Sequence, residues 1–176
     1  MGKKSTSFDQ IPSRIVIIGA NGQLGWELQR TVPEGGCCIP RIIPLTSQAL
    51  DITDESAVIK CIKEHKPELI INVAAYTAVD KAEEEKEKAY AVNAEGVANL
   101  ARASASKGIR LIQLSTDFVF DGEQAAPYCP DDSTNAINVY GASKLEGERL
   151  VSEITHGEAL IVRTAWVYSR HGNNFV

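Results

Sequence analysis

Tyr140 and Lys144 are a pair of residues whose types and spacing could support acid catalysis. A helix is predicted from Asn138 to about Glu153, and residues four apart on a helix lie on the same face. A tyrosine has an ordinary pKa of about 10, which an ammonium group about 4 Å away would lower toward neutral pH. The pair therefore predicts a general acid that acts on a carbonyl group. The alternative is a surface tyrosine beside a solvated lysine.

A hydroxyl group is expected at the end of a predicted strand. The segment from Ile109 to Ser115 has the pattern of a strand, and Thr116 follows it directly. Ligands of doubly wound sheets bind beyond the carboxyl ends of the strands. Thr116 could therefore hold a substrate carbonyl oxygen, or it could only cap the loop that follows. We predict that Thr116, Tyr140 and Lys144 form one catalytic set.

A glycine-rich turn indicates a dinucleotide site. The sequence GANGQLG covers residues 19–25, between a β-branched strand over 14–18 and a helix from Gln23 to about Thr31. Glycines let the backbone approach a pyrophosphate, and the helix N-terminus offers N–H groups and a favourable dipole to the anion. A turn that only reverses the chain is the alternative. The residues predicted to contact the cofactor here are Gly19, Asn21, Gly22, Gln23, Leu24 and Gly25.

The region after the second predicted strand favours NADPH, with NADH as the alternative. An acidic residue that binds the ribose of NAD usually stands there. In this chain the strand over 41–45 leads into Thr46 and Ser47, so no carboxylate is present to repel a 2′-phosphate. Asp51 and Ile52 follow and could contact the adenine, although Asp51 equally fits a turn or helix-entry position.

Strands and helices alternate along the chain. The predicted strands cover 14–18, 41–45, 69–73, 109–115 and 160–167, and the predicted helices cover 23–31, 54–65, 80–107 and 138–153. Ile59 and Ile62 are expected on the inner side of the second helix, and the charged run over 83–88 on a solvated helix face. The alternation predicts an α/β fold with a doubly wound parallel sheet of the Rossmann type.

One domain is expected over most of the chain. A polar tail over 1–12 is predicted to be disordered, and a dinucleotide-binding domain to cover 13–176. Pro33, Gly35 and Gly36 are expected to end the first helix.

Composition argues against several classes of protein. The formal net charge is −5 and no block of Lys and Arg stands out, so no nucleic-acid partner is expected. The N-terminus lacks the apolar core of a signal peptide, and no apolar run is long enough to cross a membrane. The expected location is therefore the cytoplasm. The four cysteines form no C-x-x-C pair and the three histidines are scattered, so no metal site or disulfide framework is predicted.

Longer motifs cover nearly the whole chain past the tail. They are GANGQLGW (19–26), NVAAYTAVDKAE (72–83), VNA (92–94), STDFVFDG (115–122), NVYGASKLEGE (138–148) and RTAWVYSRHGNNFV (163–176). With these motifs the chain resembles the extended short-chain dehydrogenase/reductases and, within them, the dTDP-4-dehydrorhamnose reductase family. The STD-VFDG and GNNF segments are more specific to that family than the motifs that all relatives share.

The resemblance implies a reaction on a nucleotide sugar. A nicotinamide cofactor, NADPH or NADH, would reduce the C4 ketone of dTDP-4-dehydro-L-rhamnose to give dTDP-L-rhamnose. By family role Tyr140 protonates the new oxygen, Lys144 tunes that tyrosine and holds the nicotinamide ribose, and Thr116 positions the carbonyl. The resemblance also implies cofactor contacts for Ala74, Ala75, Tyr76 and Ser115, and sugar contacts for Val79, Asp117, Phe118 and Trp166.

Several positions depart from the family pattern. Phe118 stands where a tyrosine is usual, Pro130 where a glutamate is often found, and Ala136 where proline is common. The lost tyrosine hydroxyl could change affinity or specificity for the sugar. Family members also continue well past residue 176, so we expect a C-terminal substrate-binding segment to be absent. This chain should then bind the dinucleotide but turn over the sugar poorly.

Metal binding and assembly are also suggested by relatives. Some bacterial members bind Mg²⁺ between subunits through glutamates, and Glu27 matches one of these. We expect no metal here and interpret Glu27 as a surface carboxylate on a helix. A homodimer is compatible with the resemblance.

Two other functions stay open. The regulatory subunit of methionine adenosyltransferase resembles the same family and acts by binding a partner enzyme rather than by catalysis. Sugar-nucleotide epimerases and dehydratases use the same scaffold, but they retain their cofactor through the cycle, whereas a reductase consumes it. Stoichiometric oxidation of NADPH would separate a reductase from both.

Overall fold

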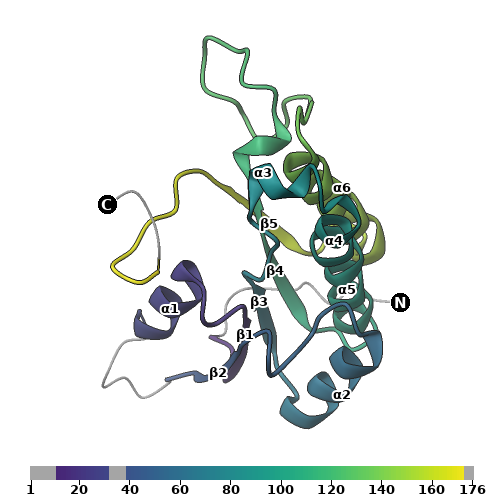
Figure 1. Ribbon diagram of the computed structural model, residues 1–176. Helices are drawn as coiled ribbons and strands as arrows, with labels where there is room; N and C mark the ends of the chain where they lie inside the picture. Colours follow the sequence, from purple (N-terminus) through teal and green to yellow (C-terminus); the bar gives the residue numbers. More distant parts are fainter. Residues whose placement is uncertain (1–10, 32–38, 173–176) are drawn as a thin grey trace.

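The computed structural model describes residues 11–31 and 39–172 (Figure 1). Most of the tail expected over 1–12 lies outside these residues. The expected end of the first helix at Pro33, Gly35 and Gly36 also lies outside them, as does the end of the last motif. The described part of the chain is a parallel sheet flanked by helices.

Within the described residues, the sheet has five parallel strands in the order β2-β1-β3-β4-β5. They are β1 (Arg14–Ile18), β2 (Arg41–Leu45), β3 (Leu69–Asn72), β4 (Arg110–Thr116) and β5 (Leu160–Thr164). The strand order reverses between β1 and β3, which is where doubly wound sheets bind their ligands. The predicted Rossmann-type fold is confirmed, although β5 ends earlier than expected.

The central strands are apolar because helices and turns cover them. Val16, Ile17 and Ile18 of β1 each expose only 1% of their surface. A parallel strand that is buried on both faces carries a continuous apolar run instead of an alternating one. Polar groups in this region pair with each other, since Asn72 of β3 donates from Nδ2 to Gln113 Oε1 of β4 at 2.8 Å.

The helices differ from the expected ones mainly in the middle of the chain. They are α1 (Gln23–Arg30), α2 (Glu55–His65), α3 (Val79–Ala82), α4 (Lys86–Tyr90), α5 (Val97–Ala105) and α6 (Val139–Thr155). A π-helical turn, η1 (Ala91–Gly96), joins α4 to α5, and a 3₁₀ turn, η2 (Asp117–Val119), follows β4. The single helix expected over 80–107 is therefore interrupted. At η1 the backbone packs so closely on α6 that a Cβ atom on Gly147 would collide with the Asn93 carbonyl.

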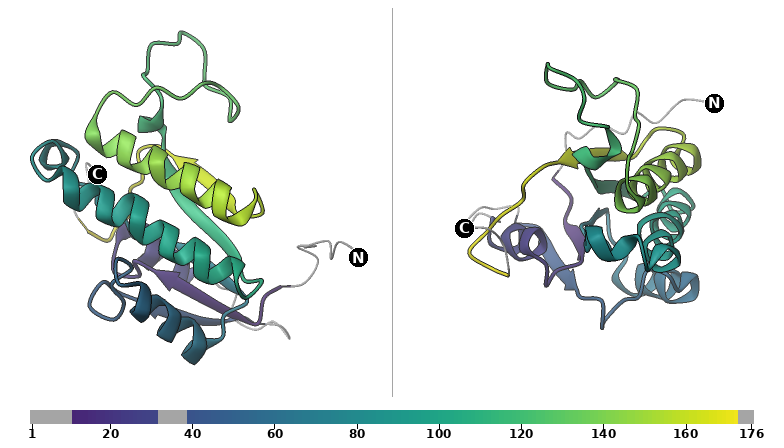
Figure 2. Two further views of the ribbon diagram at one scale, coloured as in Figure 1. Left: turned by 90° about the vertical axis from the view of Figure 1, so that its right-hand side faces the viewer. Right: turned by 45° about the horizontal axis from the view of Figure 1, so that its top comes forward.

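Two unequal helical layers cover the sheet. The helices α2, α5 and α6 lie on one face and α1 lies on the other (Figures 1 and 2). The main core lies under the larger layer, and α2 contributes Val58 and Ile62 to it. The expectation that Ile59 also faces inward is wrong, because its side chain is 40% exposed. Successive helix residues are rotated by about 100°, so Ile59 lies beside the stripe that Val58 and Ile62 share.

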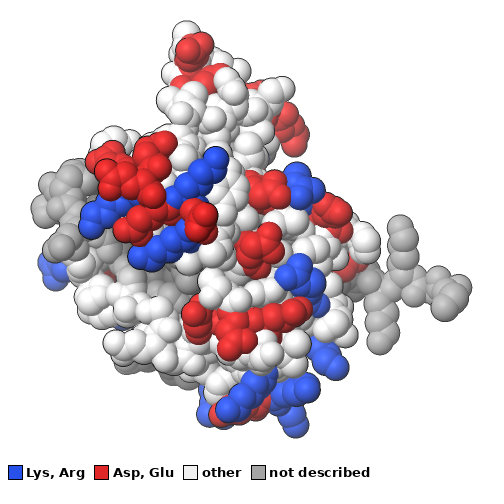
Figure 3. Space-filling model, turned by 45° about the vertical axis from the view of Figure 1, so that its right-hand side comes forward, with Lys and Arg blue, Asp and Glu red and all other residues white. Residues whose placement is uncertain are grey.

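The helical surface carries charges of both signs. Acidic and basic side chains alternate in small groups over the face drawn in Figure 3. None of the described helices has the length and the apolar character that a membrane crossing requires.

Candidate active site

A cleft of about 1040 Å³ opens at the carboxyl ends of the strands. It is lined by all the residues that the sequence assigned to a cofactor, a sugar or catalysis: Gly19, Asn21, Gly22, Gln23, Leu24, Gly25, Asp51, Ile52, Ala74, Ala75, Tyr76, Val79, Ser115, Thr116, Asp117, Phe118, Tyr140, Lys144 and Trp166. The fold therefore brings together segments from six parts of the chain, while the role of each residue stays a prediction.

The glycine turn between β1 and α1 forms one wall of the cleft, and two of its glycines are required by packing. Gly19 has φ +85°, and a Cβ atom at this position would lie 2.6 Å from the Ala74 nitrogen. A Cβ atom on Gly25 would collide with the Gly19 carbonyl. The turn is also tied to β2, because the Gly19 N–H donates to the Leu45 carbonyl at 2.9 Å. These glycines allow the turn to lie close to the strand ends, whether or not a ligand is bound.

The N-terminus of α1 is suited to an anion. Gly22 is its N-cap residue and has no side chain that could accept a hydrogen bond from the first turn. The first N–H groups of a helix have no acceptor within the helix, and the helix dipole attracts negative charge to them. A Cβ atom on Gly22 would lie 3.4 Å from the Gly19 oxygen, which is an ordinary contact, so packing alone does not require this glycine. Its missing side chain leaves the backbone accessible, as a pyrophosphate site needs.

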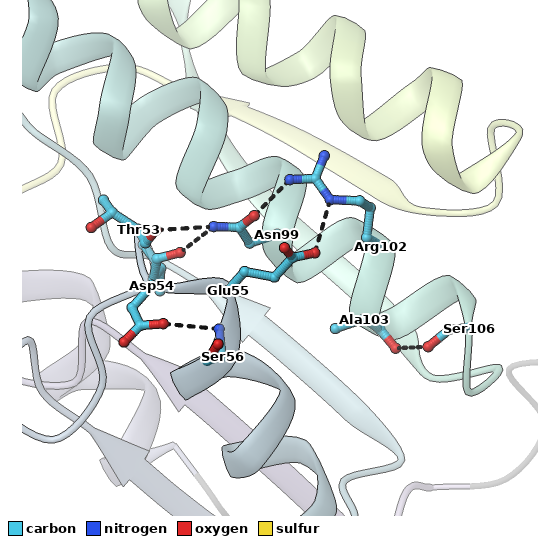
Figure 4. A network of polar contacts seen from close by, with 9 residues as sticks. Thr53, Asp54, Glu55, Ser56, Asn99, Arg102, Ala103 and Ser106 are labelled. Carbon is cyan, nitrogen blue, oxygen red and sulfur yellow. Dashed lines mark hydrogen bonds and ion pairs between the residues drawn. The ribbon is translucent and has the colours of Figure 1, made fainter.

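A polar network holds the loop at the end of the cleft where the adenine is predicted (Figure 4). Asn99 Nδ2 of α5 donates to the carbonyls of Ile52 and Thr53, at 2.9 and 3.3 Å. Asn99 Oδ1 accepts from Arg102 at 2.6 Å. Asp51 accepts from the backbone N–H and the hydroxyl of Thr53, at 2.9 and 2.7 Å. Asp51 is therefore a turn residue that also lines the cleft.

Thr116 and Tyr140 meet at the centre of the cleft. The buried Thr116 hydroxyl accepts from the Phe118 N–H at 3.2 Å and donates to Asp117 Oδ1 at 3.1 Å. It thus caps the η2 turn, which is the alternative role that the sequence allowed. The same hydroxyl is near enough to the Tyr140 phenol to influence its pKa. The Tyr140 ring packs edge-on against Phe118 with 5.6 Å between the ring centroids.

Lys144 is one helical turn beyond Tyr140 and is 4% exposed. Its Nζ donates to the Leu114 carbonyl of β4 at 2.6 Å. Burial lowers the pKa of Lys144 to about 8, and the nearby Glu148 carboxylate opposes this change. The ammonium is therefore held against the sheet and keeps its charge at neutral pH.

The acidity of Tyr140 differs from the sequence-based expectation. Burial raises the pKa of Tyr140 above its ordinary value; the hydrogen bond with Thr116 lowers it, and the charge on Asp117 raises it further. The predicted lowering by Lys144 is wrong, because burial dominates and the ammonium is bound to the Leu114 carbonyl. The phenol keeps its proton at neutral pH, as a proton donor must.

Asn93 is a supporting residue that the residue pattern did not single out. It is 1% exposed, and its Oδ1 accepts from the Tyr76 N–H at 2.8 Å. Its Nδ2 donates to the Tyr76 carbonyl and to the Ser143 hydroxyl, both at 3.0 Å. Ser143 in turn donates to the Tyr140 carbonyl at 2.7 Å. Asn93 thus joins the loop after β3 to the turn of α6 that carries Tyr140.

Glu83 is a second supporting residue, and its role was not expected. Its Oε1 accepts from the Val139 N–H at 2.9 Å, next to Tyr140 and at the start of α6. Asn138 caps the same helix by accepting from the Gly141 N–H at 2.7 Å. The charged run over 83–88 is therefore more than a solvated face. No local signal could have identified Glu83, since it lies 56 residues from its partner.

The segment after β5 crosses to the phosphate turn, beside α1 (Figure 1). The His171 ring stacks on Trp26 with 4.9 Å between centroids, and its Nε2 lies 3.1 Å from the Asn21 carbonyl. This segment also presents Trp166, which is 79% exposed. Phe118, which also lines the cleft, is 41% exposed. Exposed aromatic groups at a cleft are typical of a binding surface.

Metal ligation was not predicted, and Glu27 was the one position that relatives suggested. Glu27 lies on α1, opposite the larger helical layer. Within residues 11–31 and 39–172, no group of three His, Cys, Asp or Glu side chains is arranged to hold a metal ion.

The fold and the cleft define the class of protein. A Rossmann-type sheet carries a glycine turn after β1, a hydroxyl residue at the end of β4 and a Tyr-x-x-x-Lys pair on α6, the combination that the sequence resemblance associates with the short-chain dehydrogenase/reductases. Residues 13–176 match the RmlD substrate binding domain family. The chain belongs to this family.

Several similar proteins carry the name dTDP-4-dehydrorhamnose reductase. The dTDP-4-dehydrorhamnose reductase of Sinorhizobium fredii is 45% identical over 163 residues, which are 93% of this chain and 53% of that protein. A solved dTDP-4-dehydrorhamnose reductase from Bacillus anthracis, in complex with NADP, is 44% identical with a TM-score of 0.87, and the match covers 94% of this chain and 57% of that one. Another, from Clostridium acetobutylicum, is 48% identical with a TM-score of 0.86, over 92% and 56% of the two chains. The chain spans about half the length of the curated relatives it matches.

Proposed function

We propose that this chain binds NADPH and carries the acid catalyst that reduces the C4 ketone of dTDP-4-dehydro-L-rhamnose to dTDP-L-rhamnose. The observation that carries the proposal is the single cleft that contains the glycine turn, Thr116, Tyr140 and Lys144. The relatives with 45% and 44% identity, both called dTDP-4-dehydrorhamnose reductase, support the choice of substrate.

The residues at the cofactor end fit a dinucleotide. The N-terminus of α1 and the bare backbone at Gly22 would hold the pyrophosphate. Ser115 lines the cleft, and its buried hydroxyl has no hydrogen-bond partner within the described residues. Thr46 and Ser47 follow β2 without a carboxylate, which supports NADPH, and the solved relative from B. anthracis contains NADP.

Proton transfer would occur between Tyr140 and the sugar. When bound in the cleft, NADPH would be the source of the hydride that C4 of the sugar accepts. The Tyr140 phenol, whose raised pKa keeps it protonated, donates its proton to the ketone oxygen. The Thr116 hydroxyl, which lines the same cleft beside that phenol, would orient the same oxygen. The Lys144 ammonium, held against β4 by the Leu114 carbonyl, would bind the ribose of the nicotinamide.

The sugar would bind at the end of the cleft that Val79, Asp117, Phe118 and Trp166 line. Phe118 lacks the hydroxyl that the family usually presents there, so its contribution would come from ring packing. We also propose that residues 13–176 act as one dinucleotide-binding domain in the cytoplasm and that the chain forms a homodimer. Sedimentation of the purified chain tests the assembly.

Calorimetry with NADPH and NADH is the first test of the proposed function. We expect binding of NADPH, weaker binding of NADH, and stoichiometric NADPH oxidation once the keto-sugar is added. A folded chain that binds neither dinucleotide would contradict the proposal and favour a role in partner binding. Binding without net oxidation, together with turnover of a different nucleotide sugar, would favour an epimerase or dehydratase.

A further inference from the structure

A buried ion pair lies behind Lys144, outside the residues that line the cleft. Glu148 follows Lys144 by one turn of α6 and is 6% exposed. Arg163 of β5 binds it with both arms of the guanidinium: Nη2 lies 2.7 Å from Oε2 and Nε lies 3.0 Å from Oε1. No reaction step proposed above uses either residue.

The placement of Glu148 gives it two cationic neighbours. Residues four apart on a helix share a face, so Glu148 lies below Lys144 on the buried side of α6. Its charge opposes the effect of burial on the Lys144 ammonium. A buried ion pair contributes little net stability compared with apolar residues of similar volume. A carboxylate at this position is therefore better explained by its effect on Lys144 than by stability alone.

Arg163 connects this pair to the loop before α6. Its Nη1 donates to the Pro130 carbonyl at 3.0 Å, and the guanidinium lies 4.9 Å from the centroid of the Phe120 ring. Phe120 directly follows η2, the turn that carries Phe118. Thr164, the residue after Arg163, lines the cleft. Arg163 thus joins Glu148 to the loop before α6 and directly precedes a residue that lines the cleft.

We infer that Glu148 and Arg163 are positioning residues for Lys144. The Glu148 carboxylate attracts the ammonium and so keeps it charged and in place against β4. The Arg163 guanidinium limits the attraction between Glu148 and Lys144 and links Glu148 to the loop before α6. This inference rests on the proposed function, in which Lys144 serves the cofactor and Tyr140.

Few other charges act on the lysine within the described part of the chain. The groups on the elements packed around Lys144 are the Tyr140 phenol and Glu148 on α6, the Leu114 carbonyl on β4, Asp117 after β4, the neutral Asn93 on η1, and Arg163 on β5. Glu148 is the charged group that acts on Lys144, and Arg163 would act on the lysine through its ion pair with Glu148. Changes in the ion pair should therefore dominate the titration of Lys144.

The test is the titration of the Lys144 side chain, followed by NMR of the lysine side chains and assigned with a Lys144→Met variant. Glu148→Gln removes a negative charge, so the pKa of Lys144 should fall below about 8, by about one pKa unit. Arg163→Met removes a positive charge, so the pKa should rise by a similar amount. Glu153→Gln is the matched control, because Glu153 is an exposed carboxylate of the same helix that pairs with Arg149; it should leave the titration unchanged.

The same variants should move the pH dependence of NADPH affinity in opposite directions. In Glu148→Gln the lysine should lose its charge at a lower pH, so NADPH affinity should be lost at a lower pH than in the original chain. In Arg163→Met the lysine should keep its charge to a higher pH, so affinity should be lost only at a higher pH. A merely structural role would not produce opposite signs. If both variants move the lysine pKa the same way, or neither moves it, the inference is wrong.

A conservative variant covers the case in which Glu148→Gln does not fold. Glu148→Asp keeps the charge and should restore a titration close to that of the original chain, whereas an unrestored titration in a folded Glu148→Asp chain would contradict the electrostatic role. The NMR titration needs no cofactor. If the unmodified chain does not bind NADPH at any pH, the proposed function fails, while the lysine titrations still decide whether the ion pair controls Lys144.

Discussion

The two ends of the cleft are built in different ways. At the cofactor end the backbone is closely packed: Gly19 and Gly25 leave no room for a Cβ atom, and Asn99 holds the loop at Ile52. At the other end the lining is formed by side chains, of which Phe118 is 41% and Trp166 79% exposed. A change at the first end should therefore disturb folding and binding together. A change at the second should affect a bound sugar with little cost to the fold.

The largest effect is expected from Gly25→Val at the packed end. The new side chain would collide with the Gly19 carbonyl, so NADPH binding should be lost and the free energy of unfolding should fall by about 1–3 kcal/mol. Calorimetry and chemical denaturation measure the two effects. Gly22→Ala is the matched comparison, because its Cβ atom would make only a 3.4 Å contact; it should weaken binding without changing stability. Unchanged stability in Gly25→Val would contradict the packing argument.

The second largest effect is expected from removal of the proposed acid, which should affect the chemical step alone. Tyr140→Phe should lower turnover by at least about 10²-fold, the usual range for general acid catalysis, while NADPH affinity stays close to that of the original chain. NADPH oxidation in the presence of the keto-sugar measures this. Tyr90→Phe, a tyrosine that is not among the residues lining the cleft, is the control. Near-normal turnover in Tyr140→Phe would exclude the assigned role.

A third change tests the connection between the two ends. Asn93→Ala should reduce the free energy of unfolding by about 2–4 kcal/mol, because it removes the partners of buried groups on Tyr76 and Ser143. Asn135→Ala is the control: Asn135 is exposed and donates to Asp121, so its loss should cost less than about 1 kcal/mol. Equal losses in the two variants, measured by chemical denaturation, would show that Asn93 does not hold the cleft together.

The smallest effect on stability is expected at the exposed end. Trp166→Ala should change the free energy of unfolding by less than about 0.5 kcal/mol and should leave NADPH binding unaltered. A sugar-nucleotide ligand should bind more weakly, as calorimetry would show. A loss of stability as large as that of Gly25→Val would remove the distinction between the two ends.

The parts of the site that the sequence predicted are those with a local signal. The glycine spacing after β1 and the Tyr140–Lys144 spacing on α6 each lie within one turn or helix, and all residues predicted from them line the cleft. Predictions that depended on the burial of a side chain or on a partner distant in the sequence were less accurate. Ile59 was placed inward because it is apolar, and the pKa of Tyr140 was expected to fall because only its neighbour on the helix was considered.

The sequence by itself determined the parallel α/β fold, the positions of the strands and the residues of the cleft. The fold, the glycine turn and the Tyr140–Lys144 pair follow from apolar runs, glycine positions and helical spacing, which are properties of short segments, whereas the other cleft residues were expected from the family resemblance. Only the tertiary structure decided that Glu83 caps α6, that Lys144 binds the Leu114 carbonyl and that Glu148 pairs with Arg163. The reason is physical: the charge and acidity of a buried group depend on desolvation and on partners that the fold brings from distant parts of the chain.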